Sequence, residues 1–176
     1  VLNDLTHEGG LTAIRIEGPI NSVDQRLNRL SKELGLLDQE LSILDNEQSN
    51  IFWNRTKNLE VFKSLESNLL RIVVPISETL QVIQKFKNYE TKYFIDWGGS
   101  LIWSSFEQLN TKILNEIKDI VKKHKGYVTL IKVEEDLKAS ADIFTIDPIK
   151  YKISEKIKRS FDPKRIFNPG KMYTGI

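Results

Sequence analysis

Few side chains in this sequence are equipped for catalysis. It contains no cysteine, which excludes a thiol nucleophile, disulfides and cysteine-bound zinc or iron–sulfur centres. Its two histidines, His7 and His124, leave little for metal binding or for serine–histidine–aspartate chemistry. The acidic run at residues 134–136 has no histidine beside it, so we expect no metal site there. The sequence therefore assigns no catalytic residue and no metal ligand.

The most specific pattern lies near the C-terminus, at residues 160–173. Asp162-Pro163 is typical of the start of a single helical turn. Residues 168–170, Asn-Pro-Gly, predict a tight turn, because proline fixes φ and glycine accepts positive φ. A backbone restricted in this way loses little entropy when it is positioned. We expect three apolar side chains to anchor the segment to a core: Phe161, Ile166 and Phe167.

Hydrophobic periodicity predicts alternating strands and helices along the rest of the chain. We expect strands at residues 12–17, 69–74, 92–97, 101–103 and 127–131, and 39–44 could be a further one. We expect helices beginning at Ser22 with Gln25 completing a capping box, at Asp45 or Asn46, at Ser77, at residue 108, and at Asp147. In the last of these, a buried apolar stripe is expected to contain Ile149, Ile153 and Ile157.

This order of elements predicts an α+β fold, with an antiparallel-rich sheet covered by helices on one face, in the manner of ferredoxin-like domains. The segment Gly98-Gly99-Ser100 between two strands is typical of a hairpin turn. Apolar residues make up 40% of the chain and charged residues 28%, which is the composition of a globular protein. No apolar run approaches the roughly 18 residues that span a bilayer.

Positive charge gathers near the C-terminus. Residues 150–171 contain eight basic and two acidic side chains and carry +6, whereas the whole chain carries +2. One interpretation is a basic face for an anionic cofactor or an acidic partner. The other, which the apolar stripe of the same helix favours, is the solvated side of an ordinary amphipathic helix.

The chain begins at Val1, and residues 1–10 end in Gly9-Gly10 and resemble a linker. We expect a piece of a longer protein, although loss of an initiator methionine would give the same start. The expected organisation is a linker at 1–10, one domain at 11–160, and a C-terminal tail at 161–176 that returns toward a missing N-terminal domain.

The segment from Asp162 to Tyr173 reads D-P-K-R-I-F-N-P-G-K-M-Y, without a gap. It resembles the motif D-P-x-x-I-F-N-P-G-K-M-Y that ends the C-terminal substrate (cap) domain of FAD-linked oxidases of the vanillyl-alcohol oxidase type. Further segments look like the E-type, FAD-binding subunits of glycolate oxidases within this family: residues 14–19, 52–53, 74–75, 95–99, Trp103 and 125–130.

The resemblance implies a flavoprotein whose FAD is bound mainly by an N-terminal domain, since no glycine-rich phosphate loop occurs in this sequence. It implies oxidation of glycolate to glyoxylate by hydride transfer to the flavin, with a D-type flavin subunit and an iron–sulfur subunit as partners. It also implies a cytoplasmic location, with attachment to the inner membrane through the complex. The cofactor-facing residues would be Asn168, Gly170 and Lys171. The histidine-rich motif of D-type relatives is missing, so the E-type pattern fits better than the catalytic D-type one. Without the N-terminal FAD domain, the isolated chain would be colourless and inactive.

Two other functions fit parts of the sequence. A non-catalytic interaction subunit would share the same fold. A ferredoxin-like nucleic-acid-binding module would use the basic tail and the aromatic strands, but the RNA-recognition signature K/R-G-F/Y-G/A-F is missing. We therefore expect no nucleic-acid partner.

Overall fold

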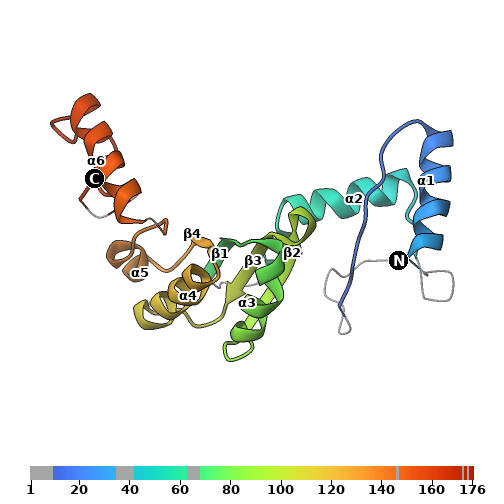
Figure 1. Cartoon of the computed structure of the whole chain (residues 1–176), viewed down its shortest axis with the longest axis horizontal. Coiled ribbons are helices and arrows are strands. Elements are labelled where there is room, and N and C mark those ends of the chain that lie inside the picture. The colour runs from blue at the N-terminus through green and yellow to red at the C-terminus, as the bar shows by residue number, and fades with distance from the viewer. Residues whose placement is uncertain (1–9, 35–41, 63–67, 146, 172, 174) are drawn as a thin grey trace. The chain divides into compact units, whose positions relative to one another are not determined.

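The computed structural model describes the chain except for residues 1–9, 35–41, 63–67, 146, 172 and 174. The chain forms two compact units, Val1–Ser64 and Leu65–Ile176, and Figure 1 labels the elements of both. No helix among the described residues is both long enough and apolar enough to cross a membrane.

The first unit is helical. Helix α1 spans Ile20–Glu33 and α2 spans Asn46–Lys57, followed by a 3-10 turn at Glu60–Phe62. The predicted start of α2 is confirmed, because the Asp45 carboxylate accepts from Gln48 N at 2.8 Å and the Gln48 side chain accepts from Asp45 N.

Two predictions for the first unit are wrong. The predicted cap of α1 fails because the helix begins before Ser22, whose backbone N–H already donates to Pro19 O at 2.9 Å. Residues 12–17 alternate as a strand does, but they lie outside any ladder among the described residues. Alternation alone makes a strand only where another strand pairs with it. Residues 42–44 also lie outside the sheet, and 39–41 lie outside the described residues.

The second unit contains a four-stranded antiparallel sheet. Its strands are β1 (Asn68–Val73), β2 (Thr91–Asp96), β3 (Leu101–Phe106) and β4 (Tyr127–Lys132), in the order β2-β3-β1-β4. Helix α3 (Thr79–Phe86) connects β1 to β2, and α4 (Thr111–Lys123) connects β3 to β4. This βαββαβ connectivity confirms the predicted ferredoxin-like α+β fold.

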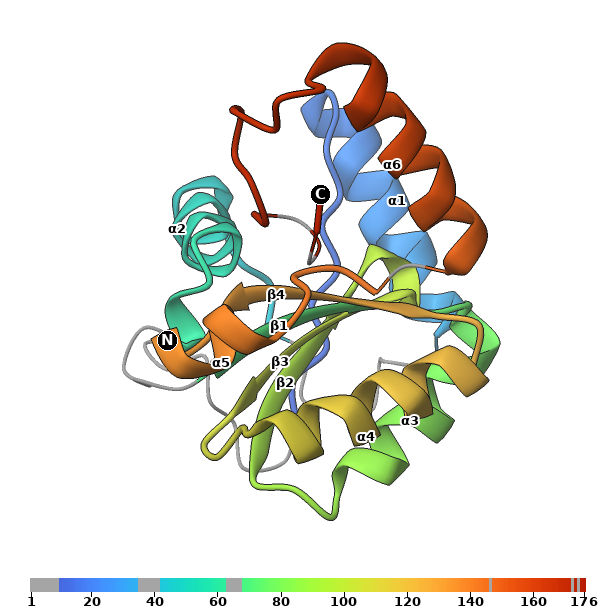
Figure 2. The same cartoon turned by 90° about the vertical axis from the view of Figure 1, so that its left-hand side faces the viewer.

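Helices α3 and α4 cover one face of the sheet, as Figure 2 shows. The hydrophobic core lies between the sheet and these two helices. It is built from alternate residues of the strands and from the inner faces of both helices: Leu70, Ile72, Val82, Phe86, Ile102, Phe106, Leu114, Ile117, Val121 and Val128. Helix coverage of one face is thus confirmed. Within α3, Val82 and Phe86 face this core, whereas Leu80 is 70% exposed.

The two helices are tied together at one end of the sheet. The predicted cap at Ser77 is wrong, because a 3-10 turn at Ile76–Glu78 precedes α3. His124, which ends α4, places its Nδ1 2.6 Å from the Glu78 carboxylate. This contact lowers the pKa of Glu78 below its usual value, since a hydrogen-bonded and charge-paired carboxylate favours its ionised form.

The chain ends in two helices, α5 (Glu135–Ser140) and α6 (Pro148–Phe161). The predicted start of α6 is confirmed, because the Asp147 carboxylate accepts from Ile149 N at 2.9 Å and from Lys150 N at 3.0 Å. The predicted burial of its apolar stripe is wrong. The side chains of Ile149, Ile153 and Ile157 are 72%, 53% and 55% exposed. They remain outside the core because α3 and α4 already fill the covered face of the sheet.

Gly126 joins α4 to β4 where the backbone passes close to the core. A Cβ at this position would lie 2.4 Å from Val74 Cγ1 and 2.5 Å from Val73 O. Gly126→Ala should therefore reduce the free energy of unfolding by about 3 kcal/mol, because the backbone oxygen has no room to retreat. Denaturant unfolding measures this, with Lys123→Ala on the exposed end of α4 as the control. An unchanged midpoint for Gly126→Ala would contradict the described packing.

Candidate functional site

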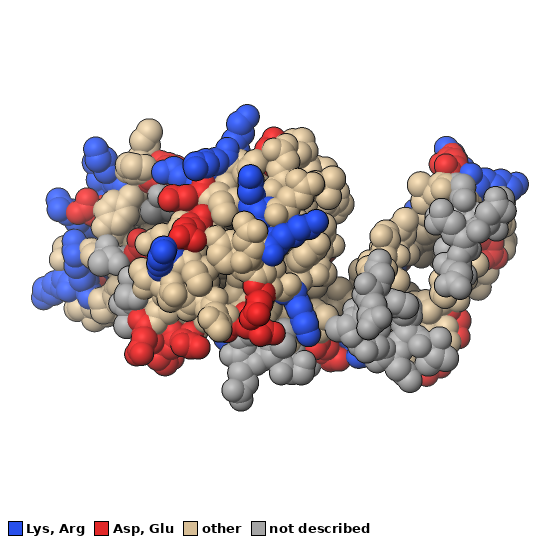
Figure 3. Space-filling model, turned by 90° about the horizontal axis from the view of Figure 1, so that it is seen from below, with Lys and Arg blue, Asp and Glu red and all other residues tan. Residues whose placement is uncertain are grey.

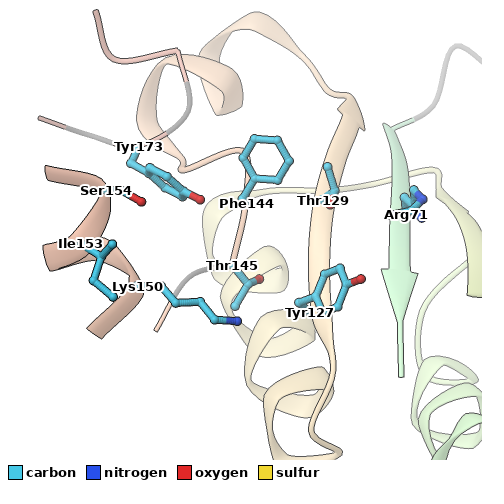
Figure 4. A pocket seen from close by; sticks show the side chains of 9 residues that line it. All are labelled: Arg71, Tyr127, Thr129, Phe144, Thr145, Lys150, Ile153, Ser154 and Tyr173. Atoms are coloured by element: carbon cyan, nitrogen blue, oxygen red, sulfur yellow. The ribbon is translucent and has the colours of Figure 1, made fainter. Parts of the chain in front are cut away.

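A pocket of about 480 Å³ lies between the sheet face opposite the core and the C-terminal elements. Its lining comes from β1, β4, the segment before α6, α6 itself and the tail, as Figure 4 shows: Arg71, Tyr127, Thr129, Phe144, Thr145, Lys150, Ile153, Ser154 and Tyr173. This lining contains two cations and several hydroxyl groups and no carboxylate, and the Asp147 carboxylate beside it lies 3.9 Å from Lys150 Nζ. Such a surface favours a small anion.

Arg71 is the most informative residue of the pocket. It lies in the middle of β1, paired with Trp103 on one side and Thr129 on the other. Its side chain points to the face opposite the core, and its guanidinium lies 4.8 Å from the centroid of the Trp97 ring. Stacking on an aromatic face stabilises the cation without occupying its hydrogen-bond donors. Trp97 itself is 57% exposed.

Backbone contacts fix the wall between β4 and α6. Leu130 N donates to Ile143 O and Thr145 N donates to Val128 O, both at 2.9 Å. Lys118 of α4 donates from Nζ to Asp142 O at 3.0 Å, and its burial lowers the pKa of this ammonium. These contacts position Phe144 and Thr145 at the pocket. From the opposite wall, Lys150 of α6 extends its ammonium toward Thr145 in Figure 4.

The tail that follows α6, residues 162–176, is called the hook here. It begins at Asp162, whose side chain is 8% exposed and lies 2.7 Å from Lys158 Nζ. The same carboxylate accepts from Ile166 N and Phe167 N, each at 2.9 Å. The ammonium and the two amides together lower the pKa of Asp162 to about 2.

The hook folds back toward the pocket. Arg165 donates to Gly175 O, and Gly170 N donates to Ile176 O at 2.7 Å. The Tyr173 ring then packs at 6.1 Å from Phe144 and 6.2 Å from Tyr151, measured between ring centroids. The hook thus supplies one wall of the pocket through the side chain of Tyr173.

The predicted anchoring of the hook by apolar side chains is wrong. Phe161, Ile166 and Phe167 are 86%, 66% and 69% exposed. The polar contacts of Asp162 hold this part of the chain instead, since the backbone amides at 166 and 167 both bond to its carboxylate. These three apolar side chains, like the stripe of α6, are exposed on the second unit.

The residues predicted to face a cofactor lie on the hook and outside the pocket lining. Asn168 has a φ of 47° and Gly170 a φ of 68°, so the predicted tight turn uses the left-handed region at both positions. Asn168, Gly170 and Lys171 are all exposed, and Lys171 N donates to Asn168 O at 3.2 Å. Their assignment to a cofactor stays a prediction.

The positive charge of residues 150–171 is partly used within the chain. Lys158 pairs with Asp162, Arg159 with Glu155 at 3.0 Å, and Arg165 bonds to the backbone of the hook. On the face of the second unit drawn in Figure 3, basic and acidic side chains are intermixed. A continuous basic track for a nucleic-acid backbone is not visible on that face.

Sequence reasoning did not single out Arg71, Tyr127, Thr129, Lys150 or Tyr173 as pocket residues. One signal was available for Arg71, because it interrupts an otherwise apolar strand at a position facing away from the core. The others carry no local signal, since only the return of the hook and the position of α6 bring them to one place.

Asp162→Ala should release the hook, because two backbone amides and Lys158 lose their shared acceptor. We expect amide hydrogen exchange at Ile166 and Phe167 to speed up by at least about tenfold, with α4 unaffected. Glu155→Ala, which removes an ion pair on the exposed side of the same helix, is the matched control. Equal protection in the Asp162 variant and the wild type would contradict this account.

The hook should also respond to acid. The folded-state pKa of Asp162, about 2, lies below its usual value of 3.8, so its contribution is complete above pH 4 and is lost as the pH falls toward 2. Carboxyl titration by NMR measures this pKa directly. Exchange at the two hook amides should accelerate over the same interval. A midpoint at the ordinary aspartate value would show that the carboxylate is not held as described.

Comparisons with known proteins bear on the same region. Residues 144–172 match the model for FAD linked oxidases, C-terminal domain, and this range runs from the pocket wall at Phe144 through α6 and most of the hook. The chain is also similar to the glycolate oxidase subunit GlcE of Escherichia coli (strain K12), with 27% identity over 128 residues. That alignment covers 71% of this chain but 32% of the relative. No solved structure gives a significant match.

These comparisons confirm the resemblance carried by the residues from Asp162 to Tyr173. The matched range contains five of the pocket-lining residues, Phe144, Thr145, Lys150, Ile153 and Ser154, and it ends one residue before Tyr173. Residues 144–172 are therefore similar to the C-terminal domain of FAD linked oxidases, and the chain is similar to GlcE, of whose length the alignment covers about a third.

Proposed function

We propose that this chain supplies the C-terminal domain of an FAD-dependent glycolate oxidase, which oxidises glycolate to glyoxylate by transferring hydride to the flavin. The observation that carries the proposal is the pocket. It combines Arg71 and Lys150 with several hydroxyl groups, and one wall is the family-matched segment. A guanidinium and an ammonium with neighbouring hydroxyls form a suitable surface for the carboxylate of a 2-hydroxy acid.

The described residues fit part of a flavin or a small carboxylate, and they do not fit a whole dinucleotide. The pocket offers two cations and an aromatic wall, whereas the sequence has no glycine-rich loop that could hold a pyrophosphate. FAD would accordingly be bound mainly by an N-terminal domain, and a bound flavin would supply the redox chemistry. This chain's residues would then orient the substrate and limit the access of water.

The apolar surface formed by the α6 stripe and the hook is the part of the second unit that we assign to the FAD-bearing domain. Six exposed phenylalanine and isoleucine side chains on one helix and the segment that follows it are typical of an interface. Asn168, Gly170 and Lys171 lie on the same hook and would approach the cofactor from it. Further partners in this proposal are a D-type flavin subunit and an iron–sulfur subunit, with the complex in the cytoplasm or at the inner membrane.

A non-catalytic interaction subunit is the second candidate. The exposed apolar surface favours it, because that surface serves binding whether or not the pocket takes substrate. The two candidates differ in what Arg71 does: an interaction subunit has no use for a cation inside the pocket.

The isolated chain should be colourless and should not oxidise glycolate. Absorbance between 350 and 500 nm, read against protein concentration, measures bound flavin after purification in excess FAD, and dye reduction measures activity. Joining the chain to an N-terminal FAD-bearing domain, in a cell that supplies the other subunits, should give glycolate-dependent activity. Stoichiometric flavin on the isolated chain would overturn the assignment of FAD to another domain.

Within such an assembled oxidase, Arg71→Met should lower kcat/KM for glycolate by about 10- to 100-fold, because a charge-assisted contact to the carboxylate is lost. Arg71→Lys should retain part of the activity, since it keeps the charge but not the planar fork. Lys87→Met, on the exposed end of α3, is the control for a lost surface charge. Full activity of Arg71→Met would favour the interaction subunit.

A further inference from the structure

The two edge strands of the sheet, β4 and β2, differ in whether further backbone hydrogen bonds cover them. Along β4, residues 143–145 add backbone hydrogen bonds, with Leu130 N donating to Ile143 O and Thr145 N to Val128 O. Along β2, no further strand follows among the described residues, and β3 is its neighbour on the other side. Strand β2 also lacks the proline and the bulge that commonly protect an open edge.

The register with β3 determines which backbone groups of β2 face outward. Glu107 N donates to Glu90 O at 3.2 Å, so Glu90 and Glu107 form a hydrogen-bonded pair. Because such pairs alternate along an antiparallel ladder, the next ones on β2 are Lys92, Phe94 and Asp96. The backbone groups of the residues between them, Tyr93 among these, point away from β3 and toward the open edge.

We propose that this edge pairs with the β2 edge of a second copy of the chain, antiparallel and centred on Phe94. In that register Tyr93 lies opposite Ile95 of the partner subunit, and both residues have outward-facing backbone groups. Lys92 lies opposite Asp96 of the partner subunit, at a position without hydrogen bonds where side chains approach closely. A two-fold axis through Phe94 produces each of these pairs twice.

Both faces of the pairing are complementary. On one face of the sheet, Tyr93 and Ile95 are 46% and 41% exposed. In the proposed dimer, Tyr93 of each chain packs against Ile95 of the other chain. On the opposite face, the exposed Lys92 and Asp96 make no ion pair with any described residue, and they flank Phe94, which packs 6.5 Å from Trp103. Among antiparallel pairings of β2 with a second copy of itself, the register centred on Phe94 is the one that places Lys92 directly opposite the partner's Asp96.

The test uses the full 176-residue chain in a sedimentation-velocity concentration series at low salt. The wild type should form a reversible dimer. Lys92→Glu and Asp96→Lys should each weaken the dimer by about tenfold or more, because each places like charges opposite one another twice. An equimolar mixture of the two variants should restore the dimer, since every pair in the heterodimer is again of opposite charge.

Ile95→Pro tests the backbone contribution independently of charge. Proline removes an N–H that faces the open edge, which an edge strand tolerates, so the ladder to β3 should remain and the dimer should be lost. Lys112→Glu on α4 is the control for charge reversal away from the edge, and far-ultraviolet circular dichroism verifies folding. A wild type that stays monomeric at every concentration, a dimer that resists these substitutions, or a mixture that stays monomeric would each overturn the proposal.

Discussion

The ion pair and hydrogen bonds of Asp162 are the constraint on which the candidate site depends. The buried Asp162 carboxylate at the end of α6 binds Lys158 and two backbone amides. Together these three partners offset the free energy lost when the charged carboxylate is removed from water. Once they are in place, the chain turns at the start of the hook and can return along α6. Tyr173 then reaches the aromatic wall of the pocket. Without this arrangement the pocket would lose one of its walls.

The two faces of the sheet have different roles: one packs against the core and the other lines the pocket. One face is filled by α3 and α4 and has no room for a ligand. The opposite face carries Arg71 at the centre of β1 and leaves α6 and the hook beside it. The polar and charged groups that can meet a ligand are thereby supported by a closed core behind them. The apolar stripe of α6 remains open for a larger partner.

Much of the sheet unit could be predicted from the sequence. Its strands at residues 69–74 and 127–131 and the hairpin between them follow from local periodicity, and so does the start of α6 at Asp147. The predictions that failed needed tertiary information. Residues 12–17 alternate correctly but have no pairing strand among the described residues, and Ile149, Ile153 and Ile157 form a genuine stripe that is exposed among the described residues of the unit. Periodicity reports which side of an element is apolar, not what covers it.

Closure of the pocket by the hook can be measured through the nuclear Overhauser contact between the rings of Tyr173 and Phe144. The account predicts this contact in the wild-type chain at neutral pH and its loss in Asp162→Asn, which keeps the side-chain size but lacks the charge that holds Lys158. A contact of unchanged intensity in that variant would show that Tyr173 is positioned without the carboxylate, and it would contradict the account.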